Sequence, residues 1–202
     1  NLNEYKDKER HITGSINFYK SDVLITDSQF KTNISEDFIN IIYSKFKIFN
    51  SEFINVNSDA IDIDFGSGTI KNSSFKLVNG DGFDTSGSET SIENNYFEEI
   101  FDKAISIGEN SKTNIIENKI LNSNIGIAIK DGSKAKIEKN EIYKSGLADI
   151  MSYNKKTFFD KSVTDISSDN QNLKIIIQEG NLAYINNKKI NSEIINVKQL
   201  YN

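Results

Sequence analysis

The sequence of 202 residues has no cysteine, no proline and no tryptophan, and it has a single histidine, His11, and a single arginine, Arg10. The absence of cysteine excludes disulfides, thiolate nucleophiles and cysteine-ligated metals. One histidine excludes a multi-histidine zinc site and disfavours a Ser-His-Asp triad. Any chemistry in this chain must therefore rest on carboxylates, lysines, hydroxyls and amides.

Charge and hydropathy argue against two classes of partner. The formal net charge is -5, whereas a nucleic-acid binder needs a basic stripe. No apolar run approaches the roughly 18 residues that a membrane span requires. The chain begins at Asn1 without a signal-peptide pattern. We therefore expect no nucleic-acid partner and no membrane span, and we expect the chain to be part of a longer one.

Isoleucine and asparagine dominate the composition, which favours short strands joined by tight turns. The expected strands repeat every 22 or 23 residues. One apolar column contains Ile16, Ile39, Ile61, Phe83, Ile105 and Ile127. A second column, two residues further along, contains Phe18, Ile41, Ile63, Thr85, Ile107 and Ile129. A later block in each repeat begins with Ile, and its fourth residue is Ser28, Ser51, Ser73, Asn95, Asn118 or Asn140.

This repeat predicts an all-β fold, a single-stranded parallel β-helix of six to seven coils. Each repeat makes one coil, and coils stack at about 4.8 Å, so matching residues become neighbours in space. The Ile and Phe columns then fill the core, because no coil can bury its own apolar face. The Ser/Asn column is expected to satisfy backbone groups at a turn.

The segments "DGFDTSG" (81–87), "IENNYF" (92–97) and "IENKI" (116–120) carry a family resemblance. They resemble the right-handed parallel β-helix of the pectate-lyase-like superfamily, with its I-x-N-N-x-F turn and asparagine ladder. They are also similar to β-helix segments of bacterial surface proteins, including some attached to CotH-type kinase-like domains. The resemblance covers residues 12–155. It implies a right-handed helix, an extracellular or cell-surface location, and a polysaccharide or surface glycan as partner.

The period also divides the chain into three parts. We expect residues 1–11 to form a lead-in or a partial N-terminal cap, residues 12–155 the β-helix, and residues 156–202 an irregular connection and a C-terminal β cap. Within the last part, 173–195 is typical of a hairpin with a Glu-Gly-Asn turn. Such a cap would cover the last coil, whose exposed edge is otherwise a template for aggregation.

The outward positions of the first strand in each repeat carry an acidic cluster. In register, Asp62 and Asp84 lie on adjacent coils, about 5 Å apart, and Asp64 lies about 6.5 Å from Asp62 along the strand. Asp59 and Asp81 occupy matching positions at the start of the strand, and Lys103 follows one coil later. The register therefore predicts an acidic patch that faces solvent.

Three interpretations of this patch remain open. The carboxylates are solvated surface charges, or Asp62, Asp64 and Asp84 bind Ca²⁺, because a hard cation prefers oxygen ligands. In the third interpretation Asp62 and Asp84 are a catalytic pair, since glycoside hydrolysis uses carboxyl groups about 5 to 9 Å apart.

A lyase or epimerase would also need a base. Lys103 and Lys130 are the candidates, but nearby carboxylates oppose their deprotonation. The chain departs from the enzymes of the resembled superfamily, because it has neither a Gly-His-Gly nor an Arg-x-Lys motif and no arginine within the coils.

The polar residues of the same face are candidate substrate contacts: Asn40, Ser86, Ser106, Glu109 and Asp131. Glu109 and Asp131 also fit a second role, shaping the turn after the strand. Exposed aromatic rings would favour a neutral glycan, and Tyr19, Tyr43, Phe65 and Tyr96 are possible platforms. A polyuronate would be repelled by bare aspartates, and it would need bridging Ca²⁺.

Three hypotheses about function follow. The first is a glycan-binding or adhesion module displayed outside the cell. The second is an enzyme, either a Ca²⁺-assisted polysaccharide lyase or epimerase, or a glycoside hydrolase that uses Asp62 and Asp84. The third is a structural spacer within a larger surface protein.

Overall fold

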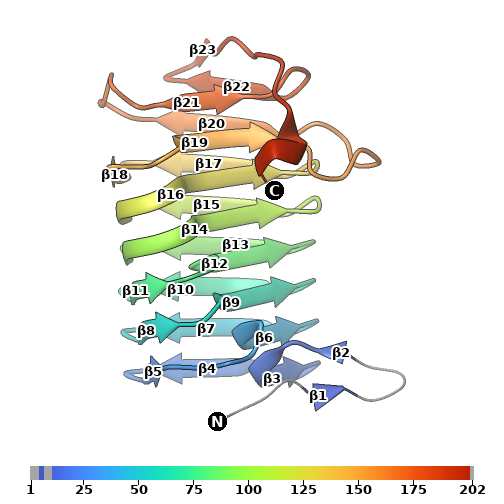
Figure 1. Ribbon diagram of the computed structural model, residues 1–202, viewed down its shortest axis with the longest axis vertical. Coiled ribbons are helices and arrows are strands. Elements are labelled where there is room, and N and C mark those ends of the chain that lie inside the picture. Colours follow the sequence, from blue (N-terminus) through green and yellow to red (C-terminus); the bar gives the residue numbers. More distant parts are fainter. Residues whose placement is uncertain (1–4, 7–10, 201–202) are drawn as a thin grey trace.

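The computed structural model describes residues 5–6 and 11–200, and in it the strands stack as successive coils along one axis (Figure 1). Neighbouring coils pair in parallel, and about eight coils are present, so the prediction of a parallel β-solenoid is confirmed with a slightly larger coil number. Most coils contain three short strands. The strands form three faces around an apolar core.

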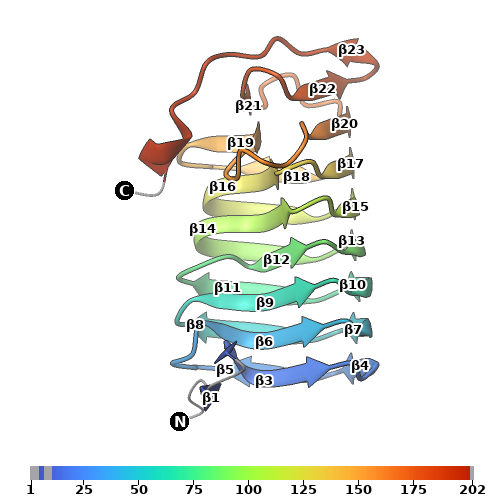
Figure 2. The ribbon, with the colours of Figure 1, turned by 90° about the vertical axis from the view of Figure 1, so that its right-hand side faces the viewer.

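Face 1 carries the predicted site and is seen broadside in Figure 2. It comprises β3 (Gly14–Tyr19), β6 (Asp37–Ile42), β9 (Asp59–Asp64), β12 (Phe83–Ser86), the second parts of β14 (Tyr96–Gly108) and β16 (Lys119–Lys130), β19 (Ala148–Tyr153) and β21 (Ile175–Ile177).

Two further faces complete each coil. Face 2 comprises β4 (Val23–Thr26), β7 (Lys45–Phe49), β10 (Ser67–Lys71), β13 (Glu89–Glu93), β15 (Lys112–Ile116), β17 (Lys134–Glu138), β20 (Val163–Ser167) and β22 (Leu182–Ile185). Face 3 comprises β5 (Gln29–Lys31), β8 (Glu52–Val56), β11 (Ser74–Val78), the first parts of β14 and β16, and β18 (Glu141–Tyr143). Since β14 and β16 bend around the corner, faces 1 and 3 form one continuous sheet.

The predicted vertical register is confirmed in the core. Phe83 pairs in parallel with Ile61 on one side and with Ile105 on the other, and all three side chains are fully buried. On face 3, Phe53, Phe75 and Phe97 stack with ring centroids 4.9 and 4.6 Å apart. Identical side chains repeated at the coil spacing therefore pack face to face along the axis.

The Ser/Asn column forms the predicted ladder. Oδ1 of Asn118 accepts hydrogen bonds from the backbone N–H and the side-chain amide of Asn95, at 2.9 and 3.0 Å. Nδ2 of Asn118 donates to the carbonyl of Ile92 at 2.8 Å and to Oδ1 of Asn140 at 2.9 Å. Buried turn groups are satisfied from coil to coil, which keeps the repeats in register.

The predicted hairpin over 173–195 is wrong in part. β21 continues face 1 in parallel with β19, and β22 continues face 2 in parallel with β20, so the turn after Ile177 joins two faces of one more coil. The hairpin that does form is shorter, and pairs β22 with β23 (Lys188–Lys189). The connection at 154–172 also contains β20, because its backbone completes the parallel ladder of face 2.

The two chain ends differ. Of the predicted lead-in, residues 1–4 and 7–10 lie outside the described residues, while β1 (Tyr5–Lys6) pairs antiparallel with β2 (His11–Ile12). At the other end η1 (Val197–Leu200) and its preceding segment pack on the outside of face 1. Among the described residues no helix is long and apolar enough to cross a membrane.

Candidate functional site on face 1

Three columns of side chains point outward from face 1, and each changes character along the axis. The first column is Asp37, Asp59, Asp81, Lys103, Ile125 and Ala148. The second is Asn17, Asn40, Asp62, Asp84, Ser106, Ala128 and Met151. The third is Tyr19, Ile42, Asp64, Ser86, Gly108, Lys130 and Tyr153. All three columns are polar over the middle coils and largely apolar toward the C-terminal end.

The expectation that this face is open to solvent is wrong for much of it. Several of its predicted site residues are buried, with exposed fractions of 1% for Asn40, 0% for Ser106, 4% for Lys103 and 7% for Lys130. The apolar outward residues are covered by the C-terminal segment, whose Ile195, Val197 and Leu200 pack on them. Beside Lys103, Gln199 and Leu200 of the same segment line a cavity together with Asp102.

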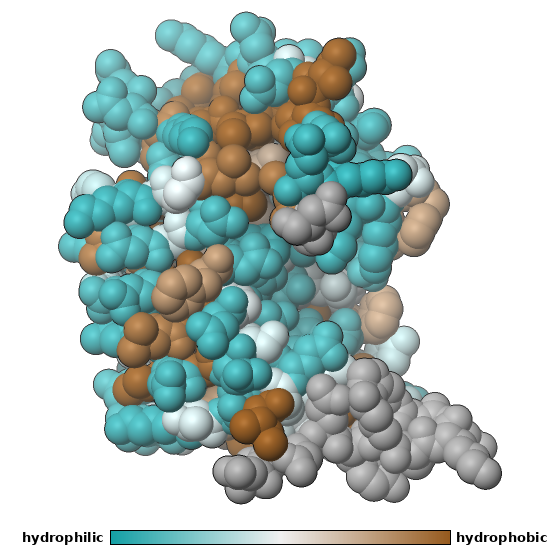
Figure 3. All heavy atoms as spheres, viewed as in Figure 1, coloured by the Kyte–Doolittle hydropathy of each residue, from teal (hydrophilic) through white to brown (hydrophobic). Residues whose placement is uncertain are grey.

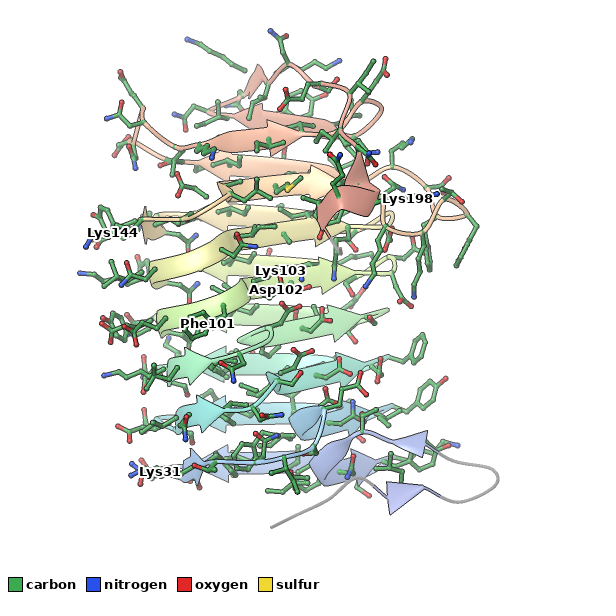
Figure 4. The ribbon with its side chains drawn as sticks, viewed as in Figure 1. Lys31, Phe101, Asp102, Lys103, Lys144 and Lys198 are labelled. Atoms are coloured by element: carbon green, nitrogen blue, oxygen red, sulfur yellow. The ribbon has the colours of Figure 1, made fainter. Side chains whose placement is uncertain are left out.

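The space-filling view shows the boundary between these regions. Hydrophilic residues cover the middle of the corner that joins faces 3 and 1, and hydrophobic surface gathers beyond it toward the C-terminal coils (Figure 3). At this corner Figure 4 shows Asp102 and Lys103 turned toward the viewer, with Lys198 of η1 further along.

The first column is held by hydrogen bonds between coils. The backbone N–H of Asp81 donates to Oδ1 of Asp59 at 2.7 Å, and the backbone N–H of Lys103 donates to Oδ1 of Asp81 at 3.0 Å. The same Asp81 oxygen lies 3.2 Å from Nζ of Lys103. Each aspartate therefore binds the start of the next coil, which fixes the carboxyl groups in a stack.

In the second and third columns an amide links two carboxyl groups. Nδ2 of Asn40 donates to Oδ2 of Asp62 at 3.0 Å and to Oδ2 of Asp64 at 3.2 Å. Nζ of Lys130 lies 3.8 Å from Oδ1 of Asp84. Gly108 lies between Ser86 and Lys130 in the third column, and a Cβ there would be in ordinary contact with Cε of Lys130, at 3.4 Å.

Burial sets the protonation of the carboxyl groups. It is the main cause that raises the pKa of Asp62 well above its ordinary value, with Asp84 and Asp64 adding repulsion. Burial and then Asp81 raise the pKa of Asp59 to about 8, and burial raises that of Asp37 to about 7. Burial also opposes ionisation of Asp84, but Lys130 foremost outweighs it and lowers the pKa of Asp84.

Among the described residues, the acidic triad whose oxygens lie close enough together to hold a metal ion differs from the predicted ligands. Carboxylate oxygens of Asp59, Asp81 and Asp84 lie within 4.8 Å of one another. Asp62 and Asp64 instead share the amide of Asn40. A hard cation would find its oxygen ligands in the first triad. Lys103 and Lys130 already neutralise part of that charge.

Glu109 and Asp131 take the turn-shaping role. Oδ1 of Asp131 accepts a hydrogen bond from the backbone N–H of Lys156 at 2.8 Å, and Glu109 forms an ion pair with the side chain of the same lysine. Both also adopt positive φ, 56° for Glu109 and 53° for Asp131. They anchor the loop at 154–162 to the turn between faces 1 and 2.

Beside the acidic cluster, three aromatic rings form an exposed ladder at the edge of face 1. Tyr19, Tyr43 and Phe65 are 51%, 52% and 51% exposed. The Tyr43 and Phe65 rings are stacked with centroids 5.0 Å apart, and Tyr19 meets Tyr43 edge to face at 6.2 Å. We call these three residues the aromatic ladder. Tyr96, the fourth predicted platform, lies on face 3 instead, where Nζ of Lys76 lies 5.4 Å from its ring centroid.

The structure thus brings some of the predicted site residues together and leaves others apart. The structure brings Asp62, Asp84, Lys103 and Lys130 into one cluster and adds Asp37, which had not been predicted. The signal for Asp37 was present, because it precedes Asp59 by one repeat of 22 residues. Ser86 stays at its predicted register position between Asp64 and Gly108.

These features define the chain as a parallel β-solenoid with a charged cluster and an aromatic ladder on one face. Comparison of the sequence with models of known protein families found no match, and comparison with curated proteins found none either. The features that bear on function are therefore the fold and the side chains of face 1.

Proposed function

We propose that this chain is a glycan-binding module of a secreted or cell-surface protein, and that sugar rings stack on the aromatic ladder. The observation that carries the proposal is the stacked, half-exposed pair of Tyr43 and Phe65. Apolar rings in contact along a surface lose little entropy on binding and offer flat faces to the C–H groups of a sugar. The resemblance to pectate-lyase-like β-helices and to bacterial surface proteins supports the same assignment.

The carboxyl groups next to the aromatic ladder restrict which class of glycan can bind. Asp64 directly precedes Phe65, so a sugar on the ladder has a carboxyl group within reach of its hydroxyls. A carboxylate-rich face repels polyuronates unless a cation bridges them. We therefore expect neutral glycans to bind without added metal, and uronic-acid polymers to bind only with Ca²⁺.

A glycan panel with three variants tests the proposal. Binding of neutral and uronic-acid oligosaccharides is measured by calorimetry for the full chain, with and without Ca²⁺. Tyr43→Ala and Phe65→Ala should each lower the affinity at least tenfold. Phe101→Ala is the matched control, since this ring is 61% exposed but lies on the bend of β14 and not on the ladder. Absence of binding to every glycan would leave the structural spacer as the better assignment.

Catalysis is the second candidate, and one observation favours it. Asp62 and Asp84 are adjacent, and their pKa values are shifted in opposite directions. Such a pair has the division of roles needed by a general acid and a base or nucleophile. The side chain of Asp84 is 23% exposed, so solvent reaches it. The lysine-base variant is less favoured, because Lys103 contacts both Asp81 and Asp102.

The enzyme assay follows reducing ends and the absorbance of unsaturated products. Asp62→Asn and Asp84→Asn should each abolish turnover, while Glu117→Gln, on an exposed ion pair with Lys139, should leave it unchanged. Ca²⁺ is the cofactor proposed for the lyase or epimerase form, with Asp59, Asp81 and Asp84 as its ligands. Ca²⁺ should then raise the Tm, and Asp84→Asn should remove that increase.

A further inference from the structure

The amine of Lys103 and the carboxyl groups of Asp81 and Asp59 lie together, largely shielded from solvent, at the start of three successive coils. Nζ of Lys103 lies 3.2 Å from Oδ1 of Asp81, and their side chains are only 5% and 6% exposed. Asp59 is the next residue of the stack, and its Oδ1 accepts the backbone N–H of Asp81 at 2.7 Å. Hydrogen bonds between coils hold all three groups, so their separation does not depend on free rotation of a surface side chain.

We propose that Lys103 and Asp81 condense into an intramolecular isopeptide bond that joins neighbouring coils. This inference is independent of the proposed glycan binding. The neutral amine attacks Cγ of the protonated Asp81 carboxyl group, and Nζ–Cγ forms. Asp59 accepts the proton released from the nitrogen and returns it to the departing hydroxyl. The Cγ–O bond then breaks, and one water molecule leaves. The products are an amide and water, so no oxidant, reductant or cofactor is needed.

The geometry supplies what such a step requires. Nζ of Lys103 lies 3.2 Å from an oxygen bonded to the carbon that it would attack. Groups fixed next to each other in this way react as if at very high local concentration. A poorly hydrated site also disfavours a separated ammonium and carboxylate, and so favours the neutral amine and acid.

One carboxylate oxygen of Asp59 lies within 4.8 Å of one of Asp81. Asp59 is therefore the carboxyl group placed to receive the proton released from the amine and to pass it to the departing hydroxyl group.

Asp102 is the competing carboxyl group. Its Oδ2 lies 2.5 Å from Nζ of Lys103, and Figure 4 shows the two residues together at the corner. Its side chain is 44% exposed, however, so water hydrates it and stabilises the unreacted carboxylate. Asp102 is also the sequence neighbour of Lys103, and an amide between them would close a small strained ring. Asp81 is the better acyl group on both counts.

The bond would change how the candidate site is used. It removes Lys103 from the candidate bases and locks one complete coil into a closed loop. The amide retains a carbonyl oxygen at position 81, which is still a ligand for a hard cation.

Intact-mass spectrometry of the full chain tests the inference. After incubation near neutral pH, the wild-type mass should be lower than the sequence mass by one water molecule. Proteolysis should then yield a branched peptide in which the segment containing Asp81 is joined to the segment containing Lys103. Lys103→Arg and Asp81→Ala should restore the full mass, and Asp59→Asn should slow the loss at least tenfold. Lys112→Arg is the control, a lysine on face 2 in an exposed ion pair with Glu89, and its replacement should leave the loss unchanged.

Two results would overturn the inference. One is a wild-type chain of full mass. The other is a loss of water that persists in Lys103→Arg and makes the chain susceptible to hydroxylamine cleavage after residue 81, which would identify a succinimide at Asp81–Gly82 instead. Because the variants lose a buried ion pair and can fold poorly, the branched peptide from the wild-type chain is the deciding measurement.

Discussion

Asp84 lies one coil beyond Asp62 in parallel register, and the pKa values of the two carboxyl groups are nevertheless shifted in opposite directions. Burial and two neighbouring aspartates raise the pKa of Asp62. Burial also acts to raise the pKa of Asp84, but Lys130 reaches Asp84 across Gly108 and lowers its pKa. A lysine two coils away from Asp84 thus gives two chemically identical side chains opposite pKa shifts.

Replacing Lys130 should remove this separation. In Lys130→Met we expect the pKa of Asp84 to rise above its ordinary value, and the free energy of unfolding at pH 7 to fall by about 3 kcal/mol, because a buried charge loses its partner. Carbon-detected NMR titration of Asp84 and urea denaturation measure the two effects. Lys71→Met is the control, since its pair with Glu93 is 46% and 31% exposed and should contribute about 0 to 1 kcal/mol. An unchanged Asp84 titration would contradict the role given to Lys130.

Stability should fall as pH rises from about 4 to about 8. Asp37 and Asp59 have folded-state pKa values of about 7 and about 8, against 3.8 as the ordinary value. In that interval the folded chain binds more protons than the unfolded chain. The contribution of these groups is therefore complete below pH 4 and is lost as pH rises through their folded pKa values. The pKa of Asp84 is lowered instead, so its contribution to the free energy of unfolding is lost at acid pH.

Thermal unfolding with a metal chelator present measures this dependence. Each of the two groups should contribute a slope of up to about 1.4 kcal/mol per pH unit. The double variant Asp37→Asn/Asp59→Asn mimics the protonated forms, so its Tm should exceed that of the wild type at pH 8.5 and should depend less on pH. A wild-type Tm that increases steadily between pH 4 and 8 would show that these carboxyl groups are not held protonated.

The repeat made most of the fold predictable. Because columns such as Ile61, Phe83 and Ile105 recur at one period, counting residues was enough to place them in contact across coils. The same counting brought Asp62 and Asp84 together. The last coil was misassigned, because the run around Ile175 and Leu182 has lost the period and resembles a local hairpin in sequence.

The surroundings of the site were not predictable in this way. Val197 and Leu200 cover part of face 1. They lie outside the repeat, so the period does not predict where they pack. The acidic triad, Asp59, Asp81 and Asp84, combines two columns, and only the path of the backbone at the corner brings them within 4.8 Å. Strand spacing alone favoured Asp62 and Asp64 as the partners of Asp84.

The asparagine ladder should be costly to interrupt. Asn118→Ala leaves a buried backbone donor and buried acceptors without partners, and we expect the free energy of unfolding to fall by about 3 kcal/mol. Asn118→Ser should cost less, about 1 to 2 kcal/mol, because Ser51 and Ser73 fill the same column and accept the equivalent backbone bond. Urea denaturation ranks the variants. Equal losses for alanine and serine would show that packing, and not the hydrogen bond, decides this position.

Gly87 should be required for the aromatic ladder to keep its shape. It follows Phe65 in the next coil with a φ of +62°, and an added Cβ would lie 2.6 Å from Cδ1 of the Phe65 ring. Gly87→Ala should cost about 1 to 2 kcal/mol of stability through the left-handed backbone. It should also displace Phe65 from Tyr43. Ring-to-ring nuclear Overhauser effects between Tyr43 and Phe65 report this directly, without a glycan, and glycan affinity should fall in parallel. Gly108→Ala is the control, because its added Cβ would make only ordinary van der Waals contacts, at 3.4 Å with Cε of Lys130 and at 3.8 Å with the carbonyl oxygen of Thr85. Intact Tyr43–Phe65 contacts in Gly87→Ala would mean that the ladder does not depend on this glycine.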